Sequence, residues 1–152
     1  MIRLFRNSDL SSLHTMICNT IDASYSGIYP VRAVEYFKEY HSKDKILERS
    51  QAGIIVIIEK AGSIVATGSL VGNEILGVFV RTDSQGLGCG KRIMSELEKR
   101  AKAQGIPEII LNVSLPSRRF YEKLEYEILP ECSYDVGEGQ YLNYWPGRKT
   151  LS

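Results

Sequence analysis

The chain has 152 residues, of which 43% are hydrophobic and 24% are charged, as is typical of one ordinary globular domain. The net charge of +1 argues against a dedicated nucleic-acid binder and against a protein held on an anionic membrane. Three widely spaced cysteines without a CxxC pair, and only two histidines, argue against a disulfide framework and a metal site. The start lacks a signal-peptide pattern, and the longest apolar run, residues 54–58, is far shorter than the ~20 residues of a membrane span. We therefore expect a cytoplasmic protein with a single domain over residues 1–152.

The first third of the chain predicts a short strand followed by two helices. Residues 2–6 alternate apolar and basic side chains, as a strand does. Ser8 stands at the N-cap position of a run with helical apolar spacing that reaches Ile21. After a break at residues 24–30, helical spacing returns over residues 31–49.

Three successive strands are predicted next, because β-branched runs alternate with turn signals. The turn signals are Ala61-Gly62 and Gly72-Asn73, and the strands lie at residues 53–59, 63–71 and 74–81. A polar, glycine-rich loop at residues 82–90 and an amphipathic helix at residues 91–104 follow.

The last third predicts a strand, a short helix and two late strands. The strand covers residues 108–113, and the helix covers residues 114–124 with Ser114 as its N-cap. The late strands, at residues 126–129 and 140–145, flank a polar loop. That loop is expected over residues 132–139. The whole is an α+β (three-layer α/β) chain in the order βααβββαβαββ, which gives six to seven strands and about four helices.

The loop RTDSQGLGCGK, residues 81–91, is the most informative segment. Glycines at positions 86, 88 and 90 let the backbone approach a ligand closely, and the helix behind the loop offers unpaired N–H groups. Together they predict a phosphate or pyrophosphate cradle, to which Lys91 and Arg92 add charge. The alternative is a tight turn that needs glycine for its backbone alone.

Two common phosphate loops do not fit this segment, and a third pattern does. The dinucleotide pattern GxGxxG fails because Lys91 or Ile93 falls at its last position, and the P-loop pattern fails because Gln85 stands at its first glycine. The pattern Q/R-x-x-G-x-G/A is met by Gln85, Gly86, Leu87, Gly88, Cys89 and Gly90. The later FYEKLEYE, residues 120–127, is similar to an FYEKLGF signature. With both motifs one helix and one strand apart, the chain resembles the GCN5-related N-acetyltransferase (GNAT) superfamily.

The resemblance implies the GNAT acyl-CoA N-acyltransferase fold, with a mixed central sheet, and acetyl-CoA as cosubstrate without a metal. The pantetheine arm would pair with the main chain of Val78, Phe79 and Val80. The pyrophosphate would lie on the amides of the loop, with Gln85 at its first position. The loop residues so implied are Gln85, Gly86, Leu87, Gly88, Cys89, Gly90 and Lys91.

Two catalytic residues are implied by the resemblance. Tyr121 stands where the family places the tyrosine beside the CoA sulfur, and with an ordinary pKa of ~10 its phenol can supply a proton to the departing thiolate. Glu74 lies as far before Gln85 as the catalytic glutamate of GCN5 histone acetyltransferases lies before its motif, so it is the candidate general base. Relatives that use a water chain leave that role open. The oxyanion donor would be a strand amide near Val80.

Three positions have competing interpretations or depart from the family. Pro116 replaces an asparagine that often contacts CoA, a contact for which Ser117 or Arg118 would compensate. Glu125 replaces the usual glycine after the short helix, which costs roughly 1 kcal/mol if that residue is left-handed. Cys89 is interpreted as a small residue between two glycines and not as a reactive thiol.

The acceptor is expected between the first two helices and the late strands, where aromatic residues gather. Asp22, Glu35 or Glu39 would pair with an ammonium there. The aromatic residues are Tyr25, Tyr29, Tyr36, Tyr40, Tyr134, Tyr141, Tyr144 and Trp145.

We therefore predict an acetyl-CoA-dependent N-acetyltransferase that transfers the acetyl group directly to a primary amine in a ternary complex. The acceptor is a small-molecule amine or a peptide amine, and a homodimer is compatible with the sequence. The alternatives are a CoA-binding sensor or regulatory module without catalysis, and a generic phosphate-binding domain.

Overall fold

The computed structural model describes residues 1–152, with five α-helices, eight strands and three short 3₁₀ turns. The helices are α1 (Leu10–Tyr25), α2 (Val31–Tyr40), α3 (Lys43–Ala52), α4 (Cys89–Ala103) and α5 (Arg118–Lys123). The strands are β1 (Ile2–Leu4), β2 (Ile54–Lys60), β3 (Ser63–Val71), β4 (Glu74–Val80), β5 (Glu108–Ser114), β6 (Glu127–Ile128), β7 (Cys132–Gly137) and β8 (Gln140–Thr150).

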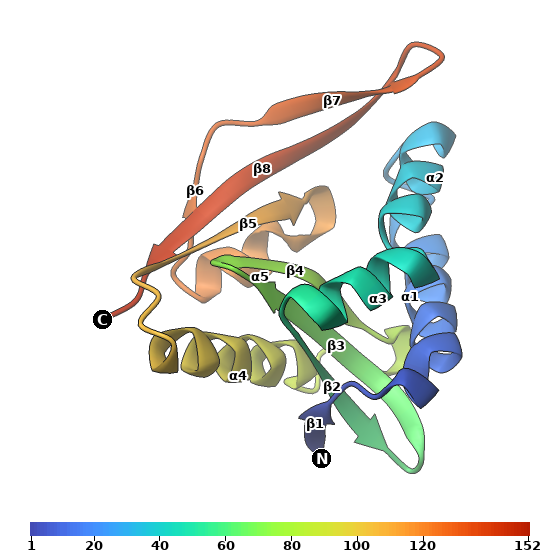
Figure 1. Ribbon diagram of the computed structural model, residues 1–152. Helices are drawn as coiled ribbons and strands as arrows, with labels where there is room; N and C mark the ends of the chain where they lie inside the picture. The colour runs from blue at the N-terminus through green and yellow to red at the C-terminus, as the bar shows by residue number, and fades with distance from the viewer.

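All eight strands belong to one mixed sheet in the order β1-β2-β3-β4-β5-β8-β6, with β7 paired to β8 (Figure 1). Every pairing is antiparallel except that of β4 with β5. The predicted α+β class and mixed sheet are confirmed, with one strand and one helix more than the predicted order contains. No helix has both the length and the apolar character needed to cross a membrane.

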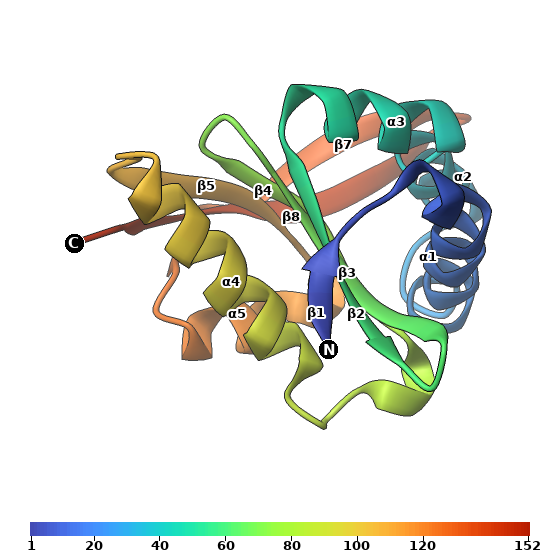
Figure 2. The same cartoon turned by 60° about the horizontal axis from the view of Figure 1, so that its bottom comes forward.

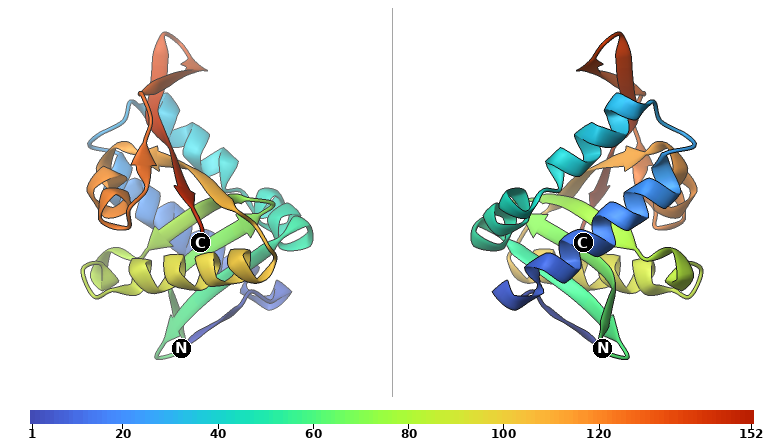
Figure 3. Two further views of the ribbon diagram at one scale, coloured as in Figure 1. Left: turned by 90° about the vertical axis from the view of Figure 1, so that its left-hand side faces the viewer. Right: turned by 90° about the vertical axis from the view of Figure 1, so that its right-hand side faces the viewer.

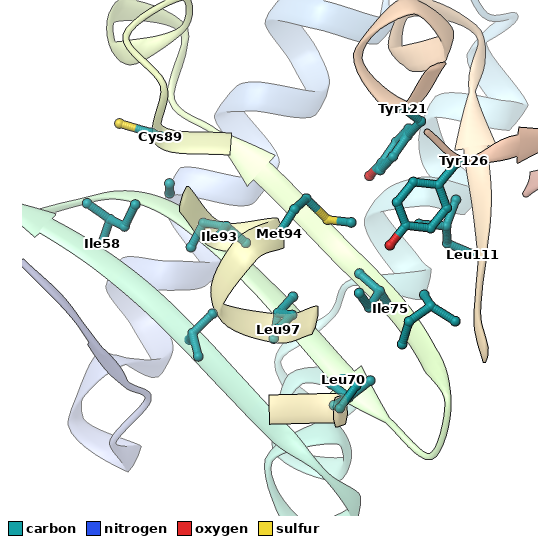
Figure 4. Packing of buried hydrophobic residues seen from close by; sticks show 14 of the residues in the cluster. Ile58, Leu70, Ile75, Cys89, Ile93, Met94, Leu97, Leu111, Tyr121 and Tyr126 are labelled. Atoms are coloured by element: carbon teal, nitrogen blue, oxygen red, sulfur yellow. The ribbon is translucent and has the colours of Figure 1, made fainter. Parts of the chain in front are cut away.

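Helices cover both faces of the sheet and enclose two apolar cores (Figure 2). The amphipathic helix α4 inserts Ile93, Met94 and Leu97 against the sheet and, together with α5, forms one core (Figure 4). Helices α1, α2 and α3 form the other core, and α1 buries Leu13, Ile17 and Ile21 there. The molecule is therefore a three-layer structure in which the buried apolar face of α4 fixes the loop that precedes this helix.

The predicted helix over residues 31–49 is wrong, because α2 and α3 are separate helices. His41 is buried at the end of α2, and the Ser42 side chain caps α3 by accepting a hydrogen bond from the Lys45 amide at 3.3 Å. Ser8 is likewise not the N-cap of α1. That helix follows a 3₁₀ turn, in which the Asp9 carboxylate accepts a hydrogen bond from the Arg6 amide at 2.7 Å.

The predicted polar loop over residues 132–139 contains strand β7. Its largely exposed side chains give no apolar alternation, so only the backbone pairing with β8 reveals it. The β7–β8 hairpin extends past β5 and lies beside α2 (Figure 3). The helix predicted from Ser114 is also different, because a 3₁₀ turn over Leu115–Ser117 precedes α5 and Ser114 makes no side-chain cap.

Strands β4 and β5 run parallel but diverge, which opens the sheet at its centre (Figure 1). Their only register pair is Glu74 with Ile110. Further along β4, Gly77 has φ +66° and lies where the pairing of β4 with β3 shifts its register. A Cβ atom at Gly77 would lie 3.1 Å from the Arg49 side chain. Such a bulge bends the strand and leaves backbone groups unpaired. The second half of β4 therefore borders an opening instead of a neighbouring strand.

Glu125 has φ +69°, in the left-handed region that favours glycine. We expect Glu125→Gly to raise the free energy of unfolding by about 1 kcal/mol, because glycine removes the steric strain of Cβ. Lys123→Gly, inside α5, is the control and should lower stability, because glycine disfavours a helix. Urea denaturation of both variants is the measurement. A less stable Glu125→Gly would show that the Glu125 side chain compensates for the strain.

Candidate active site

Two cavities meet at the opening beside β4. The loop cavity, of about 460 Å³, lies against the glycine-rich loop and the start of α4. The tyrosine cavity, of about 330 Å³, lies between α2, β4 and the β7–β8 hairpin. Residues that line both cavities are Tyr25, Val78, Phe79, Ser117 and Tyr121. A molecule that enters one cavity can therefore reach a molecule in the other.

Two left-handed glycines shape the floor of the loop cavity. Gly86 has φ +79° and Gly88 has φ +85°, and no atom lies within 4 Å of where their Cβ atoms would be. Gly88 is the N-cap of α4, so the first amides of that helix face the cavity side of the loop. Gly90 serves packing instead, because a Cβ there would lie 3.1 Å from the Phe120 ring. The loop is therefore suited to an anion, as its sequence predicts.

The other loop residues differ in what they offer. Gln85 lines the loop cavity and donates a hydrogen bond from Nε2 to the Val80 carbonyl at 2.9 Å. Lys91 also lines the cavity and brings a positive charge to it. Leu87 is 66% exposed and does not line the cavity, whereas Cys89 lines it and is buried against the α4 core. Burial of Cys89 agrees with its interpretation as a small residue that packs between glycines.

The Val80 amide faces the opening. Arg81 donates its amide to the Val65 carbonyl of β3 at 2.8 Å, and successive amides of a strand point to opposite sides. The Val80 amide therefore points away from β3, toward the side where β5 has diverged. A strand amide at this place can bind an extended ligand or an oxyanion.

The segment before α5 closes the loop cavity from the other side. Pro116 and Ser117 both line the cavity, and Pro116 offers no hydrogen-bond donor. The hydroxyls of Ser117 and Ser114 are 2.6 Å apart, so Ser117 is already engaged. Arg118 does not compensate for the missing asparagine, because its guanidinium lies 4.9 Å from the Trp145 ring centroid and pairs with Glu122.

Tyr121 lies at the junction of the two cavities, with its ring directed from α5 toward β4 (Figure 4). Its side chain is buried, and its hydroxyl makes no hydrogen bond within the protein. Burial, with a smaller effect of Tyr25, raises the pKa of Tyr121, so the phenol stays protonated at neutral pH. It is a free hydrogen-bond donor at the point where the two cavities join.

Glu74 lines the tyrosine cavity at the start of β4. Its carboxylate has no ion pair or hydrogen bond within the protein. Burial raises the pKa of Glu74, and the positive charge of Arg49 opposes part of that rise. A half-buried carboxylate with a raised pKa and no partner can accept a proton.

The acids expected to pair with an ammonium are placed elsewhere. Asp22 pairs with Lys38 at 2.6 Å, Glu35 lies 3.7 Å from Arg32, and Glu39 does not line the tyrosine cavity. The expectation for these acids is therefore wrong, because their helix faces point away from the cavity.

Only some of the expected aromatic residues line the tyrosine cavity. Tyr29 is buried and binds backbone groups, accepting from the Leu115 amide at 2.8 Å and donating to the Asn143 carbonyl. Tyr141 is half exposed and Trp145 lies under Arg118, so neither lines the cavity. The expected tyrosines that do line it are Tyr25, Tyr36, Tyr40, Tyr134 and Tyr144.

Sequence reasoning missed His41, which lines the tyrosine cavity, and Arg49 behind it. Both lie within the segment that was predicted as one long helix, where a polar residue on an otherwise apolar face was the only signal. No group of three or more His, Cys, Asp or Glu side chains is placed to hold a metal ion.

A sheet that opens between two parallel strands above a glycine-rich loop defines the acyl-CoA N-acyltransferase fold. The family model described as the acetyltransferase (GNAT) domain matches residues 19–135. The chain belongs to this family.

Solved structures are similar over nearly the whole chain. A GCN5-related N-acetyltransferase from Rhodopseudomonas palustris has a TM-score of 0.89 and 21% identity, with 99% of this chain and 95% of that one covered. The PaiA N-acetyltransferase from Thermoplasma acidophilum, in complex with coenzyme A, has a TM-score of 0.79 and 22% identity, with 99% and 98% covered. YncA from Salmonella typhimurium, with its cofactor acetyl-CoA, has a TM-score of 0.72 and 15% identity, with 100% and 94% covered. A comparison with curated proteins found no significant match.

The environment of Glu74 predicts its titration. We expect the pKa of Glu74 to lie above the ordinary carboxyl value, because burial disfavours its ionised form. Arg49→Met should raise that pKa further by removing a positive charge, whereas Arg49→Lys, the control, keeps the charge and should leave it near the native value. Carbon-detected NMR of the glutamate side chains follows the titration. A native value in the ordinary range would contradict the proposed burial of the carboxylate.

Proposed function

We propose that this chain is an N-acetyltransferase that moves the acetyl group of acetyl-CoA directly to a primary amine in a ternary complex. The observation that carries the proposal is the junction of two cavities at Tyr121, with a phosphate-binding loop in one and an unpaired carboxylate, Glu74, in the other. Binding of the two substrates on opposite sides of one opening would bring the amine to the thioester. The three free cysteines agree with a reducing, cytoplasmic location.

The loop cavity has the groups that CoA needs. Its pyrophosphate would lie on the amides of the loop and the start of α4, near Lys91. Its pantetheine arm would lie along β4 in the place of the missing strand partner. There it would accept a hydrogen bond from the outward amide of Val80. Similar folds solved with coenzyme A and with acetyl-CoA support this assignment.

The reaction uses three groups of this chain. Glu74, directly or through water, accepts a proton from the ammonium, and the free amine attacks the thioester carbonyl carbon. The Val80 amide donates a hydrogen bond to the oxyanion that forms. The carbon–sulfur bond then breaks, and the sulfur leaves as a thiolate with a hydrogen bond from Tyr121. The nitrogen gives up its remaining extra proton to the thiolate or to solvent, which leaves the neutral amide and free CoA.

The raised pKa of Tyr121 defines its role more closely. Complete transfer of its proton to a thiolate with a pKa of ~8.5 is uphill, because the phenol is the weaker acid. A hydrogen bond to the developing negative charge on sulfur has no such cost and strengthens as the bond breaks. We therefore assign Tyr121 as the donor that stabilises the leaving group.

The cradle is tested by placing a side chain on Gly88. We expect Gly88→Val to weaken CoA binding at least about 10-fold in calorimetry, because the side chain strains the loop and covers its amides. Gly62→Val is the matched control: Gly62 has φ +78° in the β2–β3 turn, far in sequence from the loop, and should leave CoA affinity unchanged. Equal CoA affinity in Gly88→Val, or tighter binding of ATP than of CoA, would contradict the proposal.

The chemistry is tested by following free thiol with acetyl-CoA and a panel of amines. We expect Tyr121→Phe to lower kcat about 10-fold or more with little change in CoA affinity, because only the leaving-group hydrogen bond is lost. Tyr141→Phe, on the exposed side of β8, is the control and should be as active as the native protein. An unchanged rate in Tyr121→Phe would refute its role. Tight CoA binding without turnover on any amine would instead indicate a CoA sensor.

The base is tested by the pH dependence of the same assay. We expect Glu74→Gln to lower kcat by about 100-fold or more at neutral pH. In the native protein, activity should fall as pH drops through the raised pKa of Glu74, because protonation removes the base. That acidic limb should be absent in Glu74→Gln. A limb that persists in the variant with little loss of kcat would show that another titrating group causes it and would contradict the role of Glu74.

A further inference from the structure

The wall of the tyrosine cavity holds one charged group. Twelve of its eighteen lining residues are hydrophobic, and Glu74 is the only acid or base among them apart from His41. No lysine or arginine lines the cavity. A carboxylate or phosphate on the acceptor would therefore be desolvated without a cation to pair with, which is costly.

His41 lines the cavity as a neutral donor. Its Nδ1 lies 2.9 Å from Nη1 of Arg49, and because a guanidinium can only donate, Nδ1 accepts and the ring proton is on Nε2. The side chain is 5% exposed, yet Nε2 has no partner within the protein and remains reachable from the cavity. An N–H donor cannot accept a hydrogen bond from an ammonium, so a second ammonium finds no partner at His41.

Arg49 adds to this exclusion. Its guanidinium contacts the wall from behind, bound to His41 and to the Tyr40 carbonyl and lying 5.2 Å from the Tyr40 ring centroid. The positive charge of Arg49 thus already acts on the single carboxylate of Glu74, although the two groups form no ion pair. A polyamine would bring two or more positive charges to a wall that has one acid.

Aromatic rings from different elements form the rest of the cavity. Tyr36 of α2 lies 5.0 Å from Tyr134 of β7, and 6.0 Å from Tyr40 in a stacked arrangement. Tyr144 of β8 completes this side. Ring faces and edges at such spacing pack favourably against a flat apolar group.

We propose that the acceptor is a compact monoamine whose ammonium is its only charge and whose body is aromatic or otherwise flat and apolar. The inference rests on the proposed function. Glu74 binds the ammonium and the tyrosines pack against the body. The cavity discriminates against amino acids and polyamines because a further charge finds no second side chain of opposite charge in the lining.

Three probes that differ in charge test the inference in the thiol-release assay. They are 2-phenylethylamine, phenylalanine, which adds a carboxylate to the same body, and spermidine, which adds further ammonium groups. We expect kcat/KM for 2-phenylethylamine to exceed both others at least about 100-fold, because an unpaired buried charge is strongly rejected. Leu76→Lys places a cation in the lining. It should lower the ratio of kcat/KM for 2-phenylethylamine to that for phenylalanine at least about 10-fold.

Calorimetry on the CoA-loaded protein tests binding apart from turnover. We expect 2-phenylethylamine to bind most tightly of the three, with about 10-fold weaker binding in Tyr134→Ala. Tyr141→Ala, an equally exposed tyrosine outside the cavity, is the control and should bind as the native protein does.

The outcomes separate this inference from the proposed function. Turnover with a preference for phenylalanine or spermidine would overturn the inference and leave the proposed function in place. Absence of turnover with these probes and with every amine of the wider panel, while acetyl-CoA binds, would overturn the proposed function. The order of binding to the CoA-loaded protein would then decide the inference, because tightest binding of phenylalanine or spermidine would overturn it.

Discussion

The divergence of β4 from β5 is the constraint on which the rest of the structure depends. A sheet whose strands stay paired offers no free backbone at its centre, but here a single register pair, Glu74 with Ile110, is followed by an opening. The left-handed Gly77 bends β4, and the space that a side chain would need is limited by Arg49. As a result the Val80 amide, the loop and the tyrosine cavity all face one opening.

The two apolar cores hold the two sides of that opening independently. Burial of Ile93, Met94 and Leu97 fixes α4, and with it the loop whose amides are unpaired. The other core fixes α1 and α2, from which Tyr25, Tyr36 and Tyr40 project into the tyrosine cavity. Rigid support on both sides allows a loop rich in glycine, which is flexible in an unfolded chain, to hold a defined shape.

The candidate catalytic groups are kept in states that do not favour stability. A carboxyl whose pKa is higher in the folded than in the unfolded protein costs stability once the pH is above its unfolded value, and this describes Glu74. The free hydroxyl of Tyr121 and the free Nε2 of His41 also lack partners. Unpaired polar groups gathered in one place are typical of a functional site, because their partners are the substrates.

The sequence by itself determined the fold class, the central strands and the loop from Gln85 to Lys91, because turn signals and apolar periodicity are local properties. Its resemblance to the GNAT motifs also singled out Glu74 and Tyr121. Only the tertiary structure decided which tyrosines share a cavity, that β7 is a strand, and that His41 and Arg49 form a buried pair. These depend on contacts between distant segments. A strand with exposed side chains shows no apolar periodicity, and two helices separated by only two residues, His41 and Ser42, look continuous in sequence.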